Sequence, residues 1–299
     1  MKGRALPGRF GSGTMTSAPS RTASVPLRQS QPPKAPASTG EAPPSRAAAA
    51  GKHVLCEKPI ALDASQARRL LAARDRHGVL ICEAAMARIH PRWRKVRQLL
   101  RDRSIGELRT FAGTFGYRLV RPDNVRYDPT IGGGVLLDTG FYPVTMSRFC
   151  FEAEPITVMA RAHRLSDGGV DRLTSAVLEF SEGHAVFSVG METCPVQRSH
   201  LIGTAGYIEL VNPWNPAGDR PSEIAINTNP QIDDPVPPPI RVPAVDQYTL
   251  LAEEFAQAAQ NGGTGPVPLE DSVKNMVVLD ALRRSIASGR AEPVESWAG

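Results

Sequence analysis

The sequence has few of the residues from which metal centres and disulfide frameworks are built. Its four cysteines, Cys56, Cys82, Cys150 and Cys194, are scattered through 299 residues and form no C-x-x-C pair. No paired histidines accompany them. This distribution favours reduced thiols in a cytoplasmic protein over a zinc site or disulfides. We therefore expect no metal centre and a cytoplasmic location.

Long apolar runs and a basic folded face are also lacking. No segment stays apolar over the roughly 20 residues that a membrane-spanning helix needs, so we expect no membrane partner. The net charge is +5, but residues 1–50 hold seven Lys and Arg and one acid, Glu41, which leaves −1 on the other 249 residues. A nucleic-acid-binding domain needs basic residues gathered on a folded face. We therefore expect no nucleic-acid partner.

Residues 1–46 lack the apolar content of a folded segment. Residues 1–50 contain eight Pro, five Gly and seven Ser but one aromatic residue, Phe10. Such a composition buries too little apolar surface to offset the entropy lost on ordering, which predicts a disordered leader over residues 1–46. An organellar targeting segment is an alternative, since the stretch is poor in acids and contains Arg and Ser, but it has no amphipathic periodicity.

Residues 47–86 have the pattern of an α/β unit. Apolar strands are predicted at 53–57 and 79–84, with a helix at 63–78 between them. We expect Asp63 or Ser65 to cap this helix and Gly78 to end it. Continuously apolar strands on either side of a helix are typical of a parallel sheet that is covered on both faces.

Residues 87–299 have the pattern of an α+β domain. A helix at 90–106 comes first, residues 211–240 are predicted to be loop, and helices at about 246–261 and 270–288 close the chain. Consecutive strands without helices between them predict an open, mainly antiparallel sheet. Strands are predicted at 107–118, 155–165, 172–180, 184–192 and 199–210, with turns at 181–183 and 204–206.

The segment 130–149, "TIGGGVLLDTGFYPVTMSRF", contains the most suggestive polar residues. Its three glycines precede an apolar helical pattern, so we expect backbone amides to be exposed at a helix start. Asp138 and Tyr142 have i, i+4 spacing and should share one helix face, with Pro143 kinking that turn. Taken singly, each of these motifs is usually structural. A glycine run, for example, is usually a loop.

Lys58, at the end of the first strand, could complete an acid–base site with this pair. A nearby ammonium should lower the pKa of the Tyr142 phenol toward working pH and could donate hydrogen bonds to a substrate hydroxyl. Asp138 would either accept from that hydroxyl or hold the lysine. Side chains at the carboxyl end of a parallel strand are where such sheets place their ligands.

These segments together resemble the glucose–fructose oxidoreductase and inositol dehydrogenase (Gfo/Idh/MocA) family. The resemblance rests on "GKHVLCEKPIAL", "EAAMARIHPRWRKVRQLL", "IGELRTFAGTFGY" and "RYDPTIGGGVLLDTGFYPVTMSRF", and it runs from about Gly51 to the C-terminus. The tyrosine at position 142, where many members carry histidine, is similar to the glucose–fructose oxidoreductase and dihydrodiol dehydrogenase branch.

The resemblance implies an NAD- or NADP-binding Rossmann domain, of which 47–86 would be the C-terminal part, followed by the sheet domain, 87–299. Lys58 would be the active-site lysine of E-K-P, which a cis proline often follows. Tyr142 would transfer the proton, with Asp138 beside it. Glu57, Lys58 and Pro59 would bind the cofactor, and Arg88 would lie near the substrate or the nicotinamide.

The implied reaction moves a hydride between nicotinamide C4 and a carbinol carbon of a sugar, a polyol or a cyclic diol. The branch resemblance favours NADP over NAD. Members often form homodimers or tetramers through the open face of the sheet, so the same is expected of this chain.

One element of the family pattern is missing ahead of Lys58. No strand followed by G-x-G-x-x-G precedes it, and "GRFGSG" at 8–13 has the spacing G-x-x-G-x-G. We expect residues 1–46 to be foreign to the fold, through a frame disruption or a mis-called start, and dinucleotide binding to be impaired. The alternative function is a non-catalytic, truncated member: an oligomerising or sugar-binding sheet domain without a working cofactor site.

Overall fold

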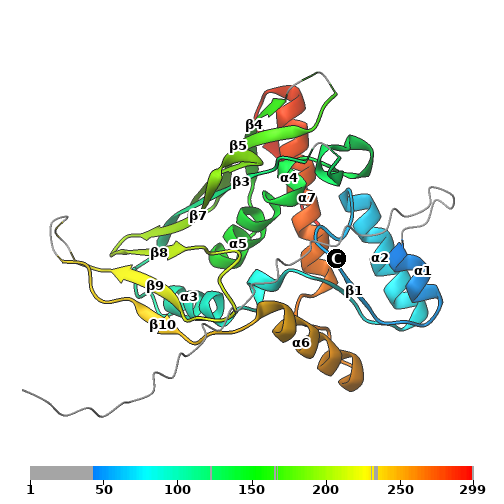
Figure 1. Ribbon diagram of the computed structural model, residues 1–299, viewed down its shortest axis with the longest axis horizontal. Coiled ribbons are helices and arrows are strands. Elements are labelled where there is room, and N and C mark those ends of the chain that lie inside the picture. Colours follow the sequence, from blue (N-terminus) through cyan, green and yellow to red (C-terminus); the bar gives the residue numbers. More distant parts are fainter. Residues whose placement is uncertain are drawn as a thin grey trace, which may run out of the picture. The chain divides into compact units, whose positions relative to one another are not determined.

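A pair of short parallel strands and one large sheet, with helices packed against them, organise the chain (Figure 1). The computed structural model describes residues 43–121, 123–164, 166, 168–229, 231 and 235–297. Most of the predicted leader, residues 1–42, lies outside the described residues. The domain boundaries that we place at 46/47 and 86/87 stay predictions.

The helices begin with α1, which starts ahead of the first predicted boundary. They are α1 (Pro43–Ala49), α2 (Ala64–His77), α3 (Pro91–Arg101), α4 (Val135–Asp138), α5 (Phe141–Phe151), α6 (Gln247–Asn261) and α7 (Leu269–Ser288). Short 3₁₀ turns are η1 (Met86–Arg88), η2 (Val125–Tyr127) and η3 (Pro129–Ile131).

The first two strands form the predicted parallel pair. Strands β1 (Val54–Cys56) and β2 (Ile81–Glu83) run side by side, with Val54 opposite Ile81. Helix α2 connects them, and the Asp63 side chain accepts a hydrogen bond from the Gln66 amide at 2.7 Å. Gly78 ends the helix in the left-handed region. The predicted strand–helix–strand unit is therefore confirmed, together with the Asp63 cap.

The remaining strands form one nine-stranded sheet. They are β3 (Leu108–Arg118), β4 (Thr157–Arg164), β5 (Asp171–Phe180), β6 (Gly183–Gly190), β7 (Glu192–Gly203), β8 (Tyr207–Val211), β9 (Ser222–Asn227), β10 (Ile240–Val242) and β11 (Glu292–Pro293). Their order is β10-β9-β8-β7-β3-β6-β5-β4-β11, and β3 pairs with β6 in parallel. The expected mainly antiparallel sheet is confirmed, with this one parallel pairing in its middle.

The prediction that 211–240 is all loop is wrong. Strand β9 pairs antiparallel with β8, and β10 extends the sheet by one more strand. Ile224 on β9 is fully buried. The prolines of this region stand outside the two strands, where they remove no ladder hydrogen bond. Their density in the sequence therefore concealed two short strands, of which β10 forms the edge of the sheet.

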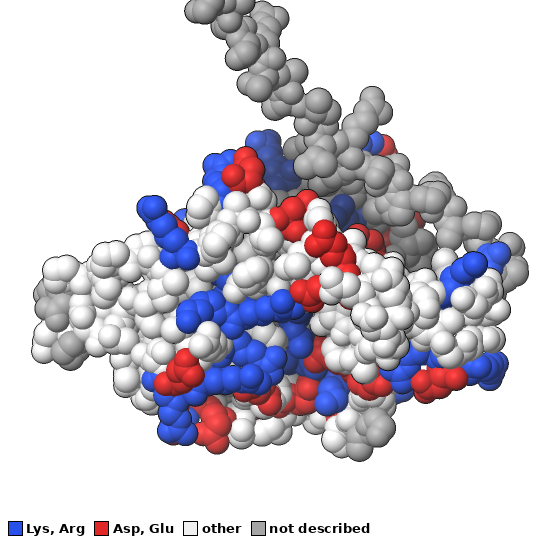
Figure 2. Space-filling model, turned by 90° about the horizontal axis from the view of Figure 1, so that it is seen from below, with Lys and Arg blue, Asp and Glu red and all other residues white. Residues whose placement is uncertain are grey.

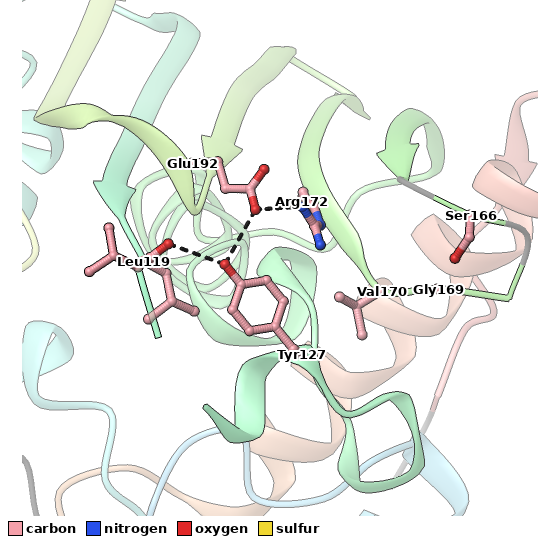
Figure 3. A pocket seen from close by; sticks show the side chains of 8 residues that line it. Leu119, Tyr127, Ser166, Gly169, Val170, Arg172 and Glu192 are labelled. Carbon is pink, nitrogen blue, oxygen red and sulfur yellow. Dashed lines mark hydrogen bonds and ion pairs between the residues drawn. The ribbon is translucent and has the colours of Figure 1, made fainter. Parts of the chain in front are cut away.

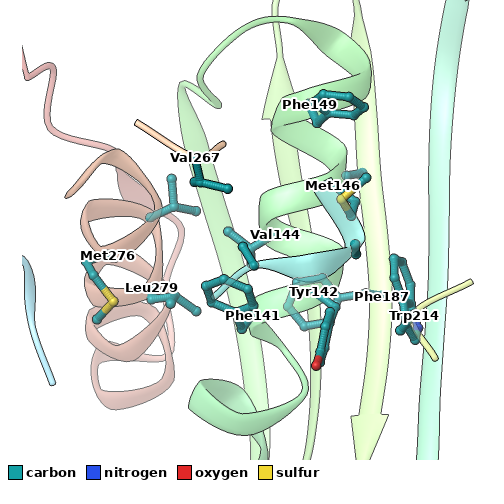
Figure 4. Close-up of a cluster of buried hydrophobic side chains, with 14 of the residues drawn as sticks. Phe141, Tyr142, Val144, Met146, Phe149, Phe187, Trp214, Val267, Met276 and Leu279 are labelled. Carbon is teal, nitrogen blue, oxygen red and sulfur yellow. The ribbon is translucent and has the colours of Figure 1, made fainter. Parts of the chain in front are cut away.

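The core lies between the sheet and helices α5 and α7 (Figure 1). Figure 4 shows the middle of it, where Phe141 and Tyr142 of α5 meet Trp214 from one side and Met276 and Leu279 of α7 from the other. The rings of Tyr142 and Trp214 have centroids 6.0 Å apart. This contact fixes the start of α5, which carries part of the candidate site.

The other face of the sheet is not covered by a helix (Figure 1). Apolar side chains from β4 to β7 are exposed there, and we call them the open face: Met159, Leu173, Val177, Val186 and Ile202. Among the helices of the described residues, none combines the length and the apolar character that a membrane span requires.

Candidate active site

Lys58 reaches across from the end of β1 to the end of α4. Its ammonium nitrogen donates to the backbone oxygen of Asp138 at 2.6 Å and to Asp138 Oδ1 at 3.0 Å. The Lys58–Pro59 peptide bond is cis, and the lysine side chain is 11% exposed. An ammonium has three N–H donors. Two of them bind Asp138, so one is left for a ligand.

Two side chains of helix α7 hold the segment that follows Lys58. Asp280 on α7 accepts from the amide of Ala64 at 2.8 Å, and Arg283 donates to the backbone oxygen of Leu62 at 2.5 Å. The lysine is therefore held by residues more than 200 positions away in the sequence.

Asp138 and Tyr142 lie on two helices rather than on one kinked helix. Asp138 is the last residue of α4, and Tyr142 is the second residue of α5. The helical conformation is interrupted at Thr139 and Gly140, ahead of Pro143. Proline is tolerated in the first turn of a helix because the amide there has no intrahelical partner. The expected kink is thus replaced by a break that starts a new helix.

Asp138 is the centre of a buried hydrogen-bond network. Besides Lys58, it accepts from the Tyr117 hydroxyl at 2.8 Å and from Arg126 Nε and Nη2 at 2.6 and 3.2 Å. Burial alone would raise the pKa of the carboxyl, but the charges of Lys58 and Arg126 outweigh it and hold that pKa well below its usual range. Asp138 is therefore a permanent anion that holds the lysine, which is one of the two roles expected for it.

The lysine keeps its charge as well. Burial on its own would lower the pKa of Lys58, but Tyr142 and Asp138 raise it above the ordinary value. Sequence reasoning did not single out Tyr117 or Arg126. Tyr117 lies near the end of β3, and Arg126 lies in η2. Only the fold brings both side chains to the Asp138 carboxylate.

Tyr142 is buried, and its hydroxyl has little to bind in the protein. Lys58 Nζ lies 5.0 Å from the centre of its ring, and the hydroxyl points away from Val144 and Met146 (Figure 4). Its acceptor within the described residues is the sulfur of Met86 at 3.9 Å, a weak partner. Such a hydroxyl is available to a substrate oxygen.

The expected lowering of the tyrosine pKa is wrong in its net direction. Lys58 does lower the pKa of Tyr142, but burial raises it more, and the Asp138 carboxylate raises it further, so the pKa lies above its ordinary value. The phenol therefore keeps its proton at neutral pH. This favours a proton donor over a proton acceptor.

The glycine run shapes the loop rather than exposing amides. The amide of Gly133 donates to the backbone oxygen of Asp128 at 2.9 Å, and that of Gly134 donates to the oxygen of Arg126 at 2.9 Å. Asp171 accepts from the first-turn amide of α4 at Leu136. Gly134 has φ +105°, and a Cβ there would lie 2.0 Å from Asp171 Oδ1. The expectation of free amides is therefore wrong, because these amides donate hydrogen bonds to oxygens of the protein itself.

Glu57 and Pro59 stand on either side of Lys58 at the carboxyl end of β1. Glu57 is exposed and Pro59 is half-buried. At the end of the neighbouring strand, the buried Glu83 accepts from the amide of Ile60 at 2.7 Å. Burial raises the pKa of Glu83 to about 7. No sequence motif marked this carboxylate, which accepts from the backbone amide two residues after Lys58.

Arg88 does not join this cluster. Its Nη1 binds Asp271 Oδ2 at 2.5 Å, and its guanidinium carbon lies 4.7 Å from the centre of the Phe149 ring. It faces a different pocket, lined by residues of α3. Its expected place near the substrate or the nicotinamide stays a prediction.

A pocket of about 410 Å³ opens beside the loop that supplies Arg126 (Figure 3). The Tyr127 hydroxyl lies 3.2 Å from the backbone oxygen of Leu119 and 3.3 Å from Glu192 Oε1. Arg172 pairs with the same Glu192 oxygen at 2.6 Å. Adjacent residues of η2 thus reach the Asp138 network and this pocket.

The polar atoms without strong partners fit a nicotinamide-dependent reaction. The third N–H of Lys58 and the hydroxyl of Tyr142 could both bind a substrate oxygen, and the nicotinamide would lie beyond the carboxyl ends of β1 and β2. Within the described ranges, no glycine-rich strand–helix turn offers a pyrophosphate cradle. In the same ranges, no group of three His, Cys, Asp or Glu could hold a metal ion.

Comparison with known families gives two matches. Residues 93–209 match the GFO/IDH/MocA C-terminal domain, and residues 30–84 match the oxidoreductase family with an NAD-binding Rossmann fold. The second match begins within the segment that we predict to be a leader.

Individual relatives agree with these matches. A Rhizobium meliloti protein described as "Uncharacterized oxidoreductase ORF334" is 40% identical over 83% of this chain and 75% of its own length. The dTDP-3,4-didehydro-2,6-dideoxy-alpha-D-glucose 3-reductase of Saccharopolyspora spinosa is 34% identical over 82% of this chain and 73% of its own. The trans-1,2-dihydrobenzene-1,2-diol dehydrogenase of Xenopus laevis is 34% identical over 56% of this chain and 51% of its own.

A solved structure shares the fold. KijD10, a 3-ketoreductase from Actinomadura kijaniata crystallised with NADP and TDP-benzene, superposes with a TM-score of 0.74 at 30% identity. The alignment covers 81% of this chain and 73% of that protein.

Proposed function

This chain belongs to the Gfo/Idh/MocA family of oxidoreductases, and from that membership we propose that it transfers a hydride between NADP or NAD and a carbinol carbon of a sugar, polyol or cyclic diol. One observation carries the proposal. Within the described residues, Lys58 keeps one N–H without a protein acceptor and the Tyr142 hydroxyl has only the weak Met86 sulfur, on side chains that lie 5.0 Å apart from ammonium nitrogen to ring centre.

The nicotinamide, when bound, supplies or accepts the hydride at C4. Lys58 binds the substrate oxygen through its third N–H and neutralises charge that develops there. In the reducing direction, Tyr142 gives its proton to that oxygen as the carbonyl carbon gains the hydride, which yields the carbinol. Lys58 then stabilises the phenolate until solvent returns the proton.

Asp138 acts through the lysine rather than on the substrate. Its carboxylate keeps Lys58 charged and in place, and Arg126 and Tyr117 in turn hold the carboxylate. Glu83 positions the backbone that follows the lysine. Because the raised pKa of Tyr142 keeps its proton in place, this arrangement favours carbonyl reduction at neutral pH.

The substrate class and the cofactor preference are supported by the relatives. One relative is named as a reductase of a deoxysugar nucleotide, another as a dehydrogenase of a cyclic diol, and the solved neighbour holds NADP. We therefore propose NADP over NAD. We also propose that this chain binds it weakly, because the sequence ahead of Lys58 contains no G-x-G-x-x-G spacing.

A titration of the full chain with NADPH and NADH tests these proposals, with ligand fluorescence and thermal shift followed together. We expect saturable binding that is tighter for NADPH than for NADH. Submicromolar binding would contradict the impairment of the cofactor site. Absence of binding by both nucleotides would favour the non-catalytic alternative, a sheet domain that oligomerises or binds sugar without redox chemistry.

We also propose that two copies pair through the open face. Its exposed apolar side chains on neighbouring strands form the kind of surface that protein interfaces bury. Val177→Lys, at a position 44% exposed, should convert a dimer into a monomer in sedimentation analysis. Val120→Lys, at an exposed position outside the strands, is the matched control and should keep the parent's mass. An unchanged mass for Val177→Lys would move the interface elsewhere.

A cytoplasmic location remains a prediction. All four cysteines are unpaired in the structure. Fractionation of the producing cells with a cytoplasmic marker enzyme would test it.

A further inference from the structure

A second pocket, of about 530 Å³, has four arginines among its lining residues and shares no lining residue with the Lys58 network. It lies where α3, η1, the end of α5 and the connection before α7 meet. Figure 2 shows Lys and Arg side chains gathered in a band on the face seen from below, the side on which α3 lies in Figure 1. We call this second pocket the arginine pocket and define it by Arg88, Arg94, Arg97, Arg101 and Phe149.

The helix spacing concentrates the positive charge. Arg94, Arg97 and Arg101 are separated by three and four residues, which places them on one face of α3. Arg88 of η1 adds a fourth guanidinium. Two of these groups lie over the same apolar ring, since the guanidinium carbons of Arg88 and Arg97 are 4.7 and 4.4 Å from the centre of Phe149.

Some carboxylates around the pocket are shared between two arginines, although Arg148 also pairs with Glu154. Arg97 and Arg101 both bind Glu152, and Arg88 shares Asp271 with the buried Arg148. Arg94 pairs with Glu254, outside the pocket lining, at 2.7 Å. Among the described lining residues, Asp102 at the end of α3 is the acidic one.

The crowding of like charges is reflected in Arg88. Burial lowers the pKa of its guanidinium first, and the nearby charges of Arg148 and Arg97 lower it further, against the opposing effect of Asp271. An added anion would relieve this repulsion. The pocket therefore favours an anionic ligand electrostatically.

The arginines also keep donors available. Arg97 and Arg101 direct Nε and Nη2 to Glu152, and Arg94 uses Nη2 for Glu254. Within the described part of the chain, Nη1 of these three side chains has no hydrogen-bond acceptor. Planar guanidinium groups with free N–H edges match the oxygen geometry of phosphate.

We propose that the arginine pocket binds the phosphate or diphosphate group of a small phosphorylated molecule. The apolar part of that molecule would pack on Phe149 and on Pro266 and Pro268, which close the pocket. The volume falls within the range of small-molecule sites, about 300–1,000 Å³. This site does not depend on the proposed hydride transfer.

The test is calorimetric titration of the full chain with inorganic pyrophosphate and with inorganic phosphate, at constant ionic strength set by chloride. We expect saturable binding, tighter for pyrophosphate because it engages more guanidinium groups. The double variant Arg94→Gln/Arg101→Gln should weaken binding at least tenfold. Both side chains are at least half exposed, so folding should be preserved.

Arg241→Gln is the matched control, because it removes a positive charge from a side chain that is 78% exposed and does not line the pocket. It should leave the affinity within twofold. No saturable binding by the parent, or equal loss in the double variant and the control, would overturn the proposal. Because no nicotinamide nucleotide is present, the result is separate from the test of the oxidoreductase function.

Discussion

Lys58→Met should lower turnover about 100- to 1,000-fold at saturating NADPH, because it removes a preorganised donor to the reacting oxygen. The loss should appear mainly in kcat, since the charge on that oxygen develops in the transition state. The substrate for this assay is the best one found in a panel of aldoses, polyols and cyclic diols. Turnover within threefold of the parent would remove Lys58 from the mechanism.

The fold should survive this change. Asp138 loses one partner but keeps Arg126 and Tyr117, so its buried charge stays compensated. The matched control is Lys52→Met, the same substitution at an exposed lysine ahead of β1. It should match the parent in turnover, and the circular dichroism spectra of both variants should agree with that of the parent.

Tyr142→Phe should reduce the rate of carbonyl reduction by a factor of about 10² to 10⁴, the usual contribution of a positioned proton donor. The ring contacts with Trp214 and Phe115 are kept, and among the described residues the lost hydroxyl has only the Met86 sulfur as a partner. Thermal stability should therefore change little. Tyr207→Phe, on β8 and hydrogen-bonded to Asn227, is the matched control and should keep full activity.

The pH dependence gives a sharper test of the same residue. Carbinol oxidation needs the phenolate, and the pKa of Tyr142 is raised mainly by burial, so oxidative kcat/KM should still rise at pH 10. Asp138 has a lowered pKa and Lys58 a raised one, so their ionisation adds no step between pH 6 and 10. Tyr142→Phe should lose this rise. A variant with the parent's profile would assign the proton to a bound water.

The extent of sequence-based prediction differs between the local elements and the site. Asp63 caps α2 through an amide three residues away, and Gly78 ends the same helix. Such signals act within a few residues, so the strands and most helices could be read in advance. The strands β9 and β10 could not, because pairing of β9 with β8 and of β10 with β9, rather than their own composition, makes them strands.

The sequence revealed only part of the candidate active site. Lys58, Asp138 and Tyr142 were identified by their order in the chain, and the structure brings them together. Tyr117 and Arg126, which complete the network around Asp138, were not singled out from the sequence. The family resemblance placed Arg88 near the substrate or the nicotinamide, and in the structure its side chain binds Asp271, 183 residues later in the chain.

The sequence by itself therefore determined the family, the parallel strand pair and the three residues most suited to the chemistry, because these depend on local pattern and residue type. Only the tertiary structure decided their protonation. Lys58 does lower the pKa of Tyr142, as its charge predicts, yet burial by Phe115, Trp214 and their neighbours raises it more. Burial depends on residues far apart in the chain, so no spacing in the sequence could set the balance between the two effects.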